Sequence, residues 1–443
     1  MIEIISILIQ FFIFLIICSF PLRPKNLNNI FGNKVNSLNY MDCHALNIII
    51  FLNILLMCSF FNINLKVIFF LFLTISTISI IYRRKEIFIL INKKNMLKFL
   101  FFFILCISIF ISTAQILKLE WDGFHWILKA LVFYNGNDIQ DIRYVKSLPE
   151  YPHLGGYIWA FFWKNSILQL EYYGRFFYIY FYIVSVFTIF NLLNFKSDKI
   201  LFLLIFITIL ITYDPYLFAG YQEYLIFSTL LIAARFIGLI DFNKKDEKNK
   251  IFLSIIIMSL LIWFKNEGLI YFLIFGSLLV ILNQTTLNFK IYYFTTIFLI
   301  ILIQYLLKKH VIGIFGSQHD LYMSEFIYLF YNFDLMILKL VTITKHLIIA
   351  MIKYPLWLIT ILLLFLIKIK TINDNLITRY FLYALILNLA IIYLIYLNID
   401  QSSYKFFLRV TLDRLIFQTS GFYLYIFIYF LNKIKFKKIN FLK

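Results

Sequence analysis

The chain has 443 residues, of which 63% are hydrophobic and only 14% are charged. Soluble domains are about 45–50% apolar and about 25% charged, so this composition excludes an ordinary water-soluble enzyme and indicates a polytopic membrane protein. The net charge of +19 would suit nucleic acid, but the Lys and Arg residues lie mainly in short gaps between apolar runs. Membrane proteins mark their cytoplasmic side in this way, and we therefore expect no nucleic-acid partner.

Apolar segments recur along the whole chain. A helix needs about 20 apolar residues to cross a hydrocarbon core about 30 Å thick. The segments are 4–20, 45–63, 67–82, 99–117, 175–194, 200–213, 216–240, 251–264, 268–283, 291–307, 335–352, 354–368, 380–398 and 415–431. Several are short, so we expect about 11–14 true spans. The predicted fold class is an all-α transmembrane bundle, because barrel strands would alternate in ten-residue segments.

The first apolar run has no basic start and no Ala-x-Ala site, so we interpret 4–20 as a retained span rather than a signal peptide. The four cysteines show no spacing typical of a disulfide framework or a zinc site.

Charge in the gaps predicts the orientation. The gap 83–98 carries six basic residues against one acid, and the gap 241–250 carries four lysines, so both should be cytoplasmic. In the loop 118–155 the acids outnumber the bases, which predicts an outside position. We expect this loop to carry short amphipathic helices.

The basic tail 433–443 should also be cytoplasmic, yet a full crossing by every later run would place it outside. One of the short pairs, 251–283 or 335–368, is therefore expected not to cross twice. We divide the chain into N-terminal helices 1–98, a transmembrane module 99–432 that carries the polar patches described next, and this tail.

The start of the first outside loop holds the densest polar group. Glu120 and Asp122 offer a carboxylate that could act as a general base, and Lys129 offers a cation for a phosphate. At helical spacing Asp122, His125 and Lys129 share one face, and Trp126 suits the membrane interface. The alternative is an interfacial turn in which Lys129 neutralises Asp122.

The stretch 150–159 contains Tyr151 and His153 and leads into an aromatic segment that ends at Trp163. Its Pro and Gly-Gly break the chain. The following rings could lie on the membrane surface and cover a lipid-facing cleft, or the stretch could be a simple re-entry turn.

Three later patches carry further charged groups next to apolar runs. Glu223 stands at a span entrance, where a charge is costly enough to suggest a role. Lys265 and Glu267 interrupt an apolar stretch. Lys265 could bind a phosphate while Glu267 restrains it, or the two could form an ion pair in a tight turn. Arg409 and Arg414 precede the last span and would suit a phosphate, although basic residues flanking a span are common.

In chain order these patches resemble the membrane-embedded GT-C glycosyltransferases, the superfamily of protein O-mannosyltransferases and aminoarabinose transferases. The matching elements lie between residues 100 and 430. They are Trp121-Asp122, His125-Trp126, Lys129-Ala130, the stretch 151–154, the Lys-Asn-Glu-Gly turn at 265–268 and the Thr-Leu-Asp-Arg run at 411–414.

The resemblance implies an inverting transfer of a hexose or pentose from a polyprenyl-phosphate carrier to an acceptor hydroxyl. The acceptor would be a glycan, lipid or protein on the outer side of a bacterial cytoplasmic membrane, and the reaction would serve cell-envelope glycan assembly. Membrane lipids would surround the enzyme. The base would be Asp122, with Glu120 as the alternate and Glu223 as a second acid. The resemblance suggests Lys129, Lys265 and Arg414 as the residues that hold the lipid phosphate, and the position of Arg409 before the last span adds it as a further candidate. The predicted substrate-binding residues are His125, Trp126, Tyr151, His153 and Glu267.

Relatives in this superfamily differ in their use of a divalent cation, so the need for one stays open. The chain has no Walker loop, Rossmann glycines, HExxH or Gly-x-Ser-x-Gly motif, which gives ATP-driven transport and soluble-type hydrolysis no support. A transporter or flippase for lipid-linked saccharides is the alternative, and a structural scaffold is a third. Transport predicts ionisable groups at mid-span depth, whereas most of those in this chain lie at span ends.

Overall fold

The computed structural model describes residues 2–22, 40–84, 93–115, 119, 122–193, 198–244, 247–313, 323–366, 376–400 and 403–433. These residues form helices and loops without a strand, which confirms the all-α class. Among them, 7 helices are long and apolar enough to cross a membrane, which fits a multi-pass membrane protein. The higher number of spans expected from sequence stays a prediction, because several apolar segments form helices of 10–17 residues.

The helices of the first half are α1 (Ile2–Ile17), α3 (Tyr40–Ser59), α4 (Leu65–Tyr82), α6 (Lys93–Gln115), α7 (Asp122–Tyr134), the 3-10 helix η1 (Ile139–Tyr144), α8 (Leu154–Lys164), α9 (Tyr172–Phe190), α10 (Asp198–Thr212) and α11 (Glu223–Ile237). Those of the second half are α12 (Lys248–Ser259), α13 (Leu261–Phe264), α14 (Glu267–Leu282), α15 (Leu287–Leu307), the π-helical turn η2 (Lys308–Ile312), α16 (Met323–Tyr331), α17 (Phe333–Lys353), α18 (Leu356–Leu366), α20 (Leu376–Leu397) and α21 (Tyr404–Lys433).

The core is built around α9 and α11, whose residues are all buried. Both helices carry a buried arginine with an acidic partner: Arg175 bonds to Glu171 at 2.8 Å and Arg235 to Asp42 of α3 at 2.9 Å. A charge buried without a partner would be very costly, so the second pair ties α3 to the core.

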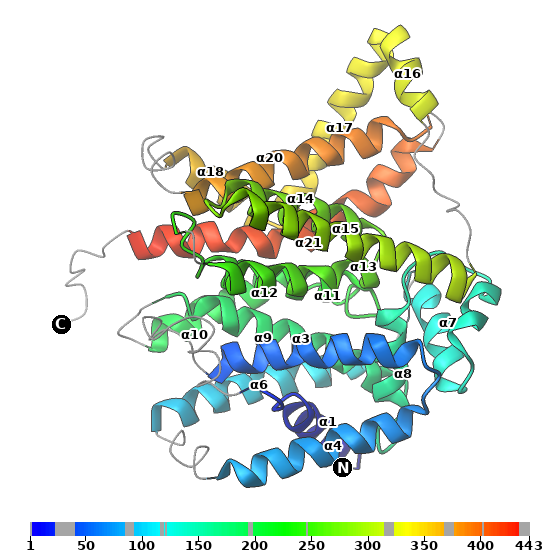
Figure 1. Cartoon of the computed structure of the whole chain (residues 1–443), viewed down its shortest axis with the longest axis vertical. Coiled ribbons are helices and arrows are strands. Elements are labelled where there is room, and N and C mark those ends of the chain that lie inside the picture. The colour runs from blue at the N-terminus through cyan, green and yellow to red at the C-terminus, as the bar shows by residue number, and fades with distance from the viewer. Residues whose placement is uncertain are drawn as a thin grey trace.

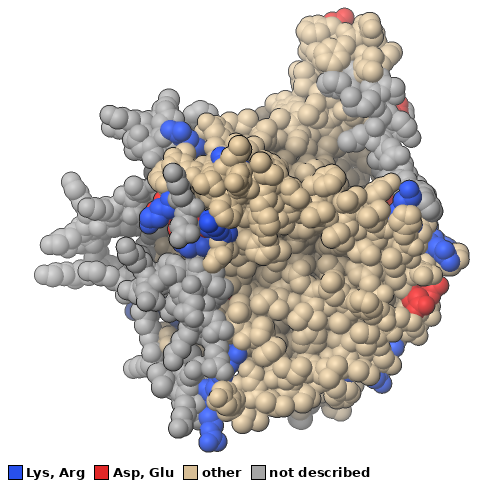
Figure 2. Space-filling view, in the orientation of Figure 1, with Lys and Arg blue, Asp and Glu red and all other residues tan. Residues whose placement is uncertain are grey.

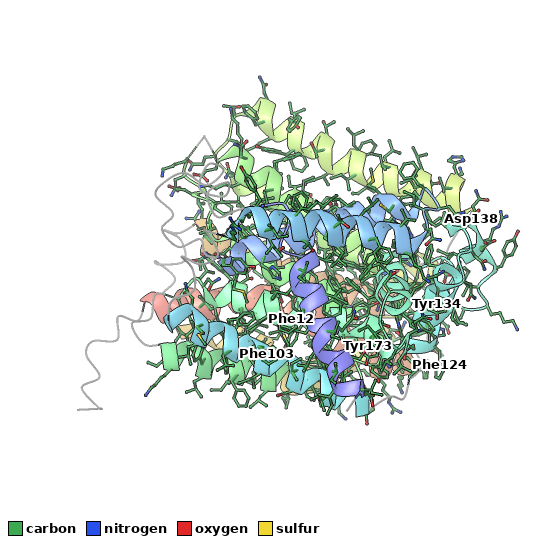
Figure 3. All side chains as sticks on the ribbon, turned by 90° about the horizontal axis from the view of Figure 1, so that it is seen from below. Phe12, Phe103, Phe124, Tyr134, Asp138 and Tyr173 are labelled. Carbon is green, nitrogen blue, oxygen red and sulfur yellow. The ribbon has the colours of Figure 1, made fainter. Side chains whose placement is uncertain are left out.

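The N-terminal helix runs across its neighbours rather than alongside them (Figure 3). It packs Phe11 and Phe12 against Phe103 of α6, with ring centroids 5.1 and 6.3 Å apart. Helices from the first 98 residues therefore pack directly on later ones.

The long helices lie side by side, and their ends form two opposite faces of the molecule (Figure 1). Lys and Arg side chains gather at the face where α21 ends, while a broad band of uncharged surface separates it from the other face (Figure 2). We call these the basic end and the loop end; the loop end carries α7 and α8, and η1 packs against α7. By the positive-inside rule we expect the basic end to be cytoplasmic.

The two short pairs differ in geometry. Segment 251–283 runs from the basic end to Lys265 at the loop end and back, because Gln284 N donates to Phe242 O at 3.2 Å in the loop after α11. By contrast, α17 contacts loop-end residues both in its second turn and at its last residue: Lys339 Nζ donates to Ile399 O at 2.7 Å, and Lys353 pairs with Asp413 of α21. The geometry favours 335–368 as the pair that crosses once.

Candidate functional site

Five of the residues predicted to form the site meet at the loop end. They come from elements that are far apart in the chain: the starts of α7, α11 and α14, the turn before α14, and the first third of α21. We call this group the ion-pair cluster, and its members are Asp122, Glu223, Lys265, Glu267 and Arg414.

Two cations hold the cluster together. Arg414 Nη1 donates to Asp122 Oδ2 and lies 3.6 Å from Glu223 Oε1. Lys265 Nζ donates to the same Glu223 oxygen at 2.9 Å and lies 3.3 Å from Glu267 Oε1. Glu223 therefore links the two cations, and one continuous chain of ion pairs runs from Asp122 to Glu267.

The three carboxylates share a local setting, since Asp122, Glu223 and Glu267 are the first residues of α7, α11 and α14. The start of a helix carries a partial positive charge and unsatisfied N–H groups, which favour a nearby anion. Lys265 takes an extended conformation between α13 and α14 (φ −149°, ψ 160°). That break in the helix turns its side chain toward Glu223.

The cluster has a buried floor and a more open rim. The side chains of Glu223 and Lys265 are 0% and 4% exposed, whereas those of Asp122 and Glu267 are 22% and 24% exposed. Three carboxylates against two cations leave a formal charge of −1. Glu223 Oε2 and Glu267 Oε2 are buried and have no hydrogen-bond partner among the described residues. These two carboxylate oxygens can therefore still accept hydrogen bonds from a ligand.

The charges around Asp122 set its acidity. Burial by itself would raise the pKa of the carboxyl, but the charges of Arg414 and Lys265 outweigh it and lower the pKa below its usual value. The ring of Tyr221 lies 5.5 Å from the guanidinium of Arg414.

A second polar group lies beside the cluster, and two of its members, Lys353 and Tyr354, were not predicted from the sequence. Lys353 pairs with Asp413 at 2.6 Å and lies 3.8 Å from Asp214, and Tyr354 donates its hydroxyl hydrogen to Asp214 at 2.6 Å. Asp413 precedes Arg414, so this group adjoins the cluster. The signal was the Lys-Tyr-Pro interruption at 353–355 between two apolar runs.

Lys129 does not reach the cluster. It lies seven residues after Asp122 on the same helix, which at 1.5 Å per residue is about 10 Å further along the axis. Its ammonium donates to Tyr151 O at 2.6 Å and lies 5.2 Å from the Trp126 ring. Burial lowers the pKa of Lys129 well below its usual value despite the opposing charge of Glu150, so this lysine is a buried anchor for the loop.

The two predicted histidines also lie outside the cluster. His125 Nδ1 bonds to Ser147 Oγ at 2.5 Å, and His153 Nε2 bonds to Ser59 Oγ at 2.8 Å. Burial, helped by the charge of Lys129, lowers the pKa of His153 to about 3.

Arg409 is exposed on α21. It precedes Arg414 by five residues, and at 3.6 residues per turn this spacing turns it about 140° away from the cluster. Glu120 lies outside the described residues. The predicted roles of these residues in binding and catalysis stay predictions.

Among the described residues, no group of three or more His, Cys, Asp or Glu could hold a metal ion. Comparisons with protein-family models, with curated proteins and with solved structures give no match.

Proposed function

We propose that this protein is a polyprenyl-phosphate-sugar-dependent glycosyltransferase and that the ion-pair cluster is its active site. The observation that supports this is the meeting of an accessible carboxylate, Asp122, with two cations at one end of an apolar helical bundle. Asp122 supplies the base, and Lys265 and Arg414 supply charge for a phosphate. The apolar surface around the bundle suits a lipid-borne donor.

The chemistry needs few groups, because a sugar on a lipid phosphate is already activated. The acceptor oxygen bonds to C1 of the sugar while its proton passes to Asp122. The bond between C1 and the phosphate oxygen breaks, and its electron pair stays on the phosphate. One direct displacement inverts the anomeric centre. Alignment of the acceptor and stabilisation of the departing phosphate supply the rate enhancement.

The ion pairs give the cluster a way to couple donor binding to catalysis. Arg414 is bound to Asp122, which weakens that carboxylate as a base. Phosphate oxygens are strong acceptors for a guanidinium, so a bound donor draws Arg414 from Asp122. The carboxylate then becomes more basic at the moment when an acceptor proton has to be taken up.

The test uses the full chain in proteoliposomes with a panel of radiolabelled undecaprenyl-phosphate hexoses and pentoses, and a membrane extract as the source of acceptors. Label attached covalently to an acceptor, with release of undecaprenyl phosphate, supports the proposal. Movement of an intact lipid-linked sugar across the bilayer without transfer would support the transporter alternative and contradict the enzyme.

A further inference from the structure

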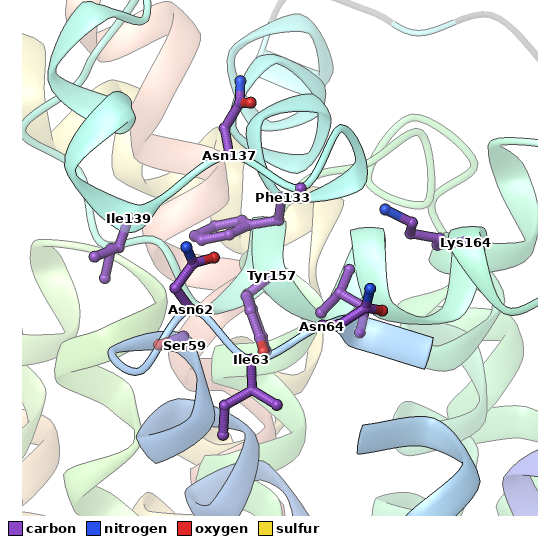
Figure 4. A pocket seen from close by; sticks show the side chains of 11 residues that line it. Ser59, Asn62, Ile63, Asn64, Phe133, Asn137, Ile139, Tyr157 and Lys164 are labelled. Carbon is purple, nitrogen blue, oxygen red and sulfur yellow. The ribbon is translucent and has the colours of Figure 1, made fainter. Parts of the chain in front are cut away.

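A polar pocket of about 210 Å³ lies at the loop end (Figure 4), and none of the residues that line it belongs to the ion-pair cluster. Three segments far apart in sequence build it: the turn between α3 and α4, the turn between α7 and η1, and helix α8. The first of these segments belongs to the N-terminal helices, for which the sequence suggests no role.

The hydroxyl of Tyr157 is the clearest sign that the pocket takes a ligand. The Tyr157 residue is only 3% exposed, and its side chain lies among the other side chains that line the pocket (Figure 4). Its Oη is buried and has no hydrogen-bond partner among the described residues. Buried hydroxyls are nearly always hydrogen-bonded, so a ligand oxygen at this position satisfies it.

The other side chains define the chemistry of that ligand. Asn62 and Asn137 bring amides, each of which can donate and accept. Asn64 adds a third amide, whose Oδ1 already accepts from Lys66 N at 2.9 Å and whose nitrogen can donate. Phe133, edge-on to Tyr157 at 4.8 Å, adds an aromatic surface. Among the described residues that line the pocket there is no Asp, Glu or His. The ammonium of Lys164 already donates to Tyr134 O at 2.6 Å. Amide donors and acceptors beside aromatic rings suit an uncharged ring that carries several hydroxyl groups.

A short path of contacts joins this pocket to the cluster. Ser59 lines the pocket and bonds to His153. The His153 ring packs edge-on against Trp263 with 6.0 Å between centroids, and Trp263 precedes Lys265 by two residues. The pocket and the ion-pair cluster therefore lie at the same end of the bundle, about 16 Å apart along α7, on which Phe133 follows Asp122 by eleven residues.

We propose that the pocket binds one uncharged sugar ring of the acceptor. Its volume of about 210 Å³ is below the roughly 300–1,000 Å³ of pockets for drug-sized ligands, which fits one ring rather than an oligosaccharide. The inference rests on the proposed function, because it assigns the ring to the substrate that receives the transferred sugar. It also gives the α3–α4 turn a part in substrate binding.

The test measures binding without transfer. Isothermal titration of the full chain in nanodiscs uses the methyl glycosides of glucose, mannose and galactose, and N-acetylglucosamine, as probes. Glucuronate and inorganic phosphate serve as anionic probes. We expect at least one uncharged sugar to bind, with Tyr157→Phe weakening it about tenfold through one lost hydrogen bond. Asn137→Trp fills the mouth and should abolish binding, whereas Asn135→Trp, an identical change two residues away and outside the lining, should leave it unchanged.

Two results would overturn the inference: binding of the anionic probes alone, or sugar binding that both Tyr157→Phe and Asn137→Trp leave unaltered. The experiments distinguish failure of the pocket assignment from failure of the proposed function. Sugar binding with the expected variant pattern but without transfer would keep the pocket and reject the enzyme. Transfer whose acceptor KM is the same in Asn137→Trp and wild type would keep the enzyme and reject the pocket.

Discussion

Glu223 is fully buried, yet one of its oxygens contacts both Lys265 and Arg414. A buried carboxylate stays ionised only when it is well paired, and removal of its partners is costly. The same contacts orient the two cations. This geometry suits a positioning role for Glu223 better than the role of second acid that the sequence predicts, while Asp122, at the rim, is better placed to meet an acceptor.

Arg414→Lys keeps the positive charge but loses the planar fork that binds two oxygens at once. We expect it to raise the apparent Kd for undecaprenyl phosphate about tenfold, the equivalent of one charge-assisted hydrogen bond, with little change in thermal stability. Arg84→Lys is the matched control, because Arg84 is exposed just after the C-terminal end of α4, away from the loop end. An equal loss of affinity in both variants, measured by titration in nanodiscs, would refute the assignment of Arg414.

His153 predicts how stability depends on pH. Burial lowers its pKa to about 3, whereas in the unfolded chain the pKa is about 6.5. The unfolded state therefore binds more protons between these values. The contribution of His153 to stability is complete above about pH 6.5 and declines as the pH falls toward 3.

The wild-type protein should lose free energy of unfolding as the pH falls from 7 to 5, and His153 should account for about 1 kcal/mol of this loss per pH unit below 6.5. His153→Gln keeps a nitrogen donor toward Ser59 but does not titrate, so the variant should lack that part of the loss. Thermal unfolding in detergent over this pH range measures the effect. An identical pH dependence in the variant and the wild type would show that His153 is not the group that titrates.

At the scale of elements, the cluster depends on the close approach of α13 and α14. A Cβ on Gly268 would lie 1.9 Å from the backbone oxygen of Leu261, so only glycine permits the turn that sets Lys265 and Glu267 in place. Gly276 lies on the same helix, but the nearest atom to its Cβ would be the flexible end of the Ile297 side chain at 3.3 Å, with the Phe272 ring at 3.9 Å.

Gly268→Ala should therefore destabilise the protein by about 1–3 kcal/mol and reduce sugar transfer, because the helices must separate. Gly276→Ala should be neutral or stabilise by up to about 1 kcal/mol through better helix propensity. Thermal unfolding and the transfer assay on both variants check this. Equal effects at the two sites would mean that the α13–α14 approach has no special importance.

At the scale of the whole molecule, the all-α class follows from long apolar segments, which only helices satisfy in lipid. The sequence also indicates charged residues that are costly near a bilayer, and five of them form the cluster. The sequence does not tell which lysine belongs there, because Lys129 and Lys265 both follow aromatic and apolar residues and both have acids nearby in the chain. Only packing turns the ammonium of Lys129 toward Tyr151 and that of Lys265 toward Glu223. The contact of Lys353 with Asp413 depends on how α17 meets α21, which no local pattern reveals.

Orientation gives a prediction for the whole chain. Single cysteines at Asn137, at the loop end, and at Asn243, in the loop between α11 and α12, are placed in a Cys58→Ser background, since the other native cysteines are buried. In intact bacterial cells expressing the protein, a membrane-impermeant maleimide should label the cysteine at 137 and not the one at 243. The reverse pattern would place the cluster in the cytoplasm and remove its access to an external acceptor.

The most direct test of the central claim is single-turnover transfer from a radiolabelled undecaprenyl-phosphate sugar by wild type and Asp122→Asn in nanodiscs. Asp241→Asn is the control, because Asp241 lies in an exposed ion pair with Lys244 in the loop after α11. We predict that Asp122→Asn stays folded and binds the donor but transfers sugar about 10²- to 10⁴-fold more slowly, while the control retains the wild-type rate. Transfer by Asp122→Asn at the wild-type rate would contradict the account.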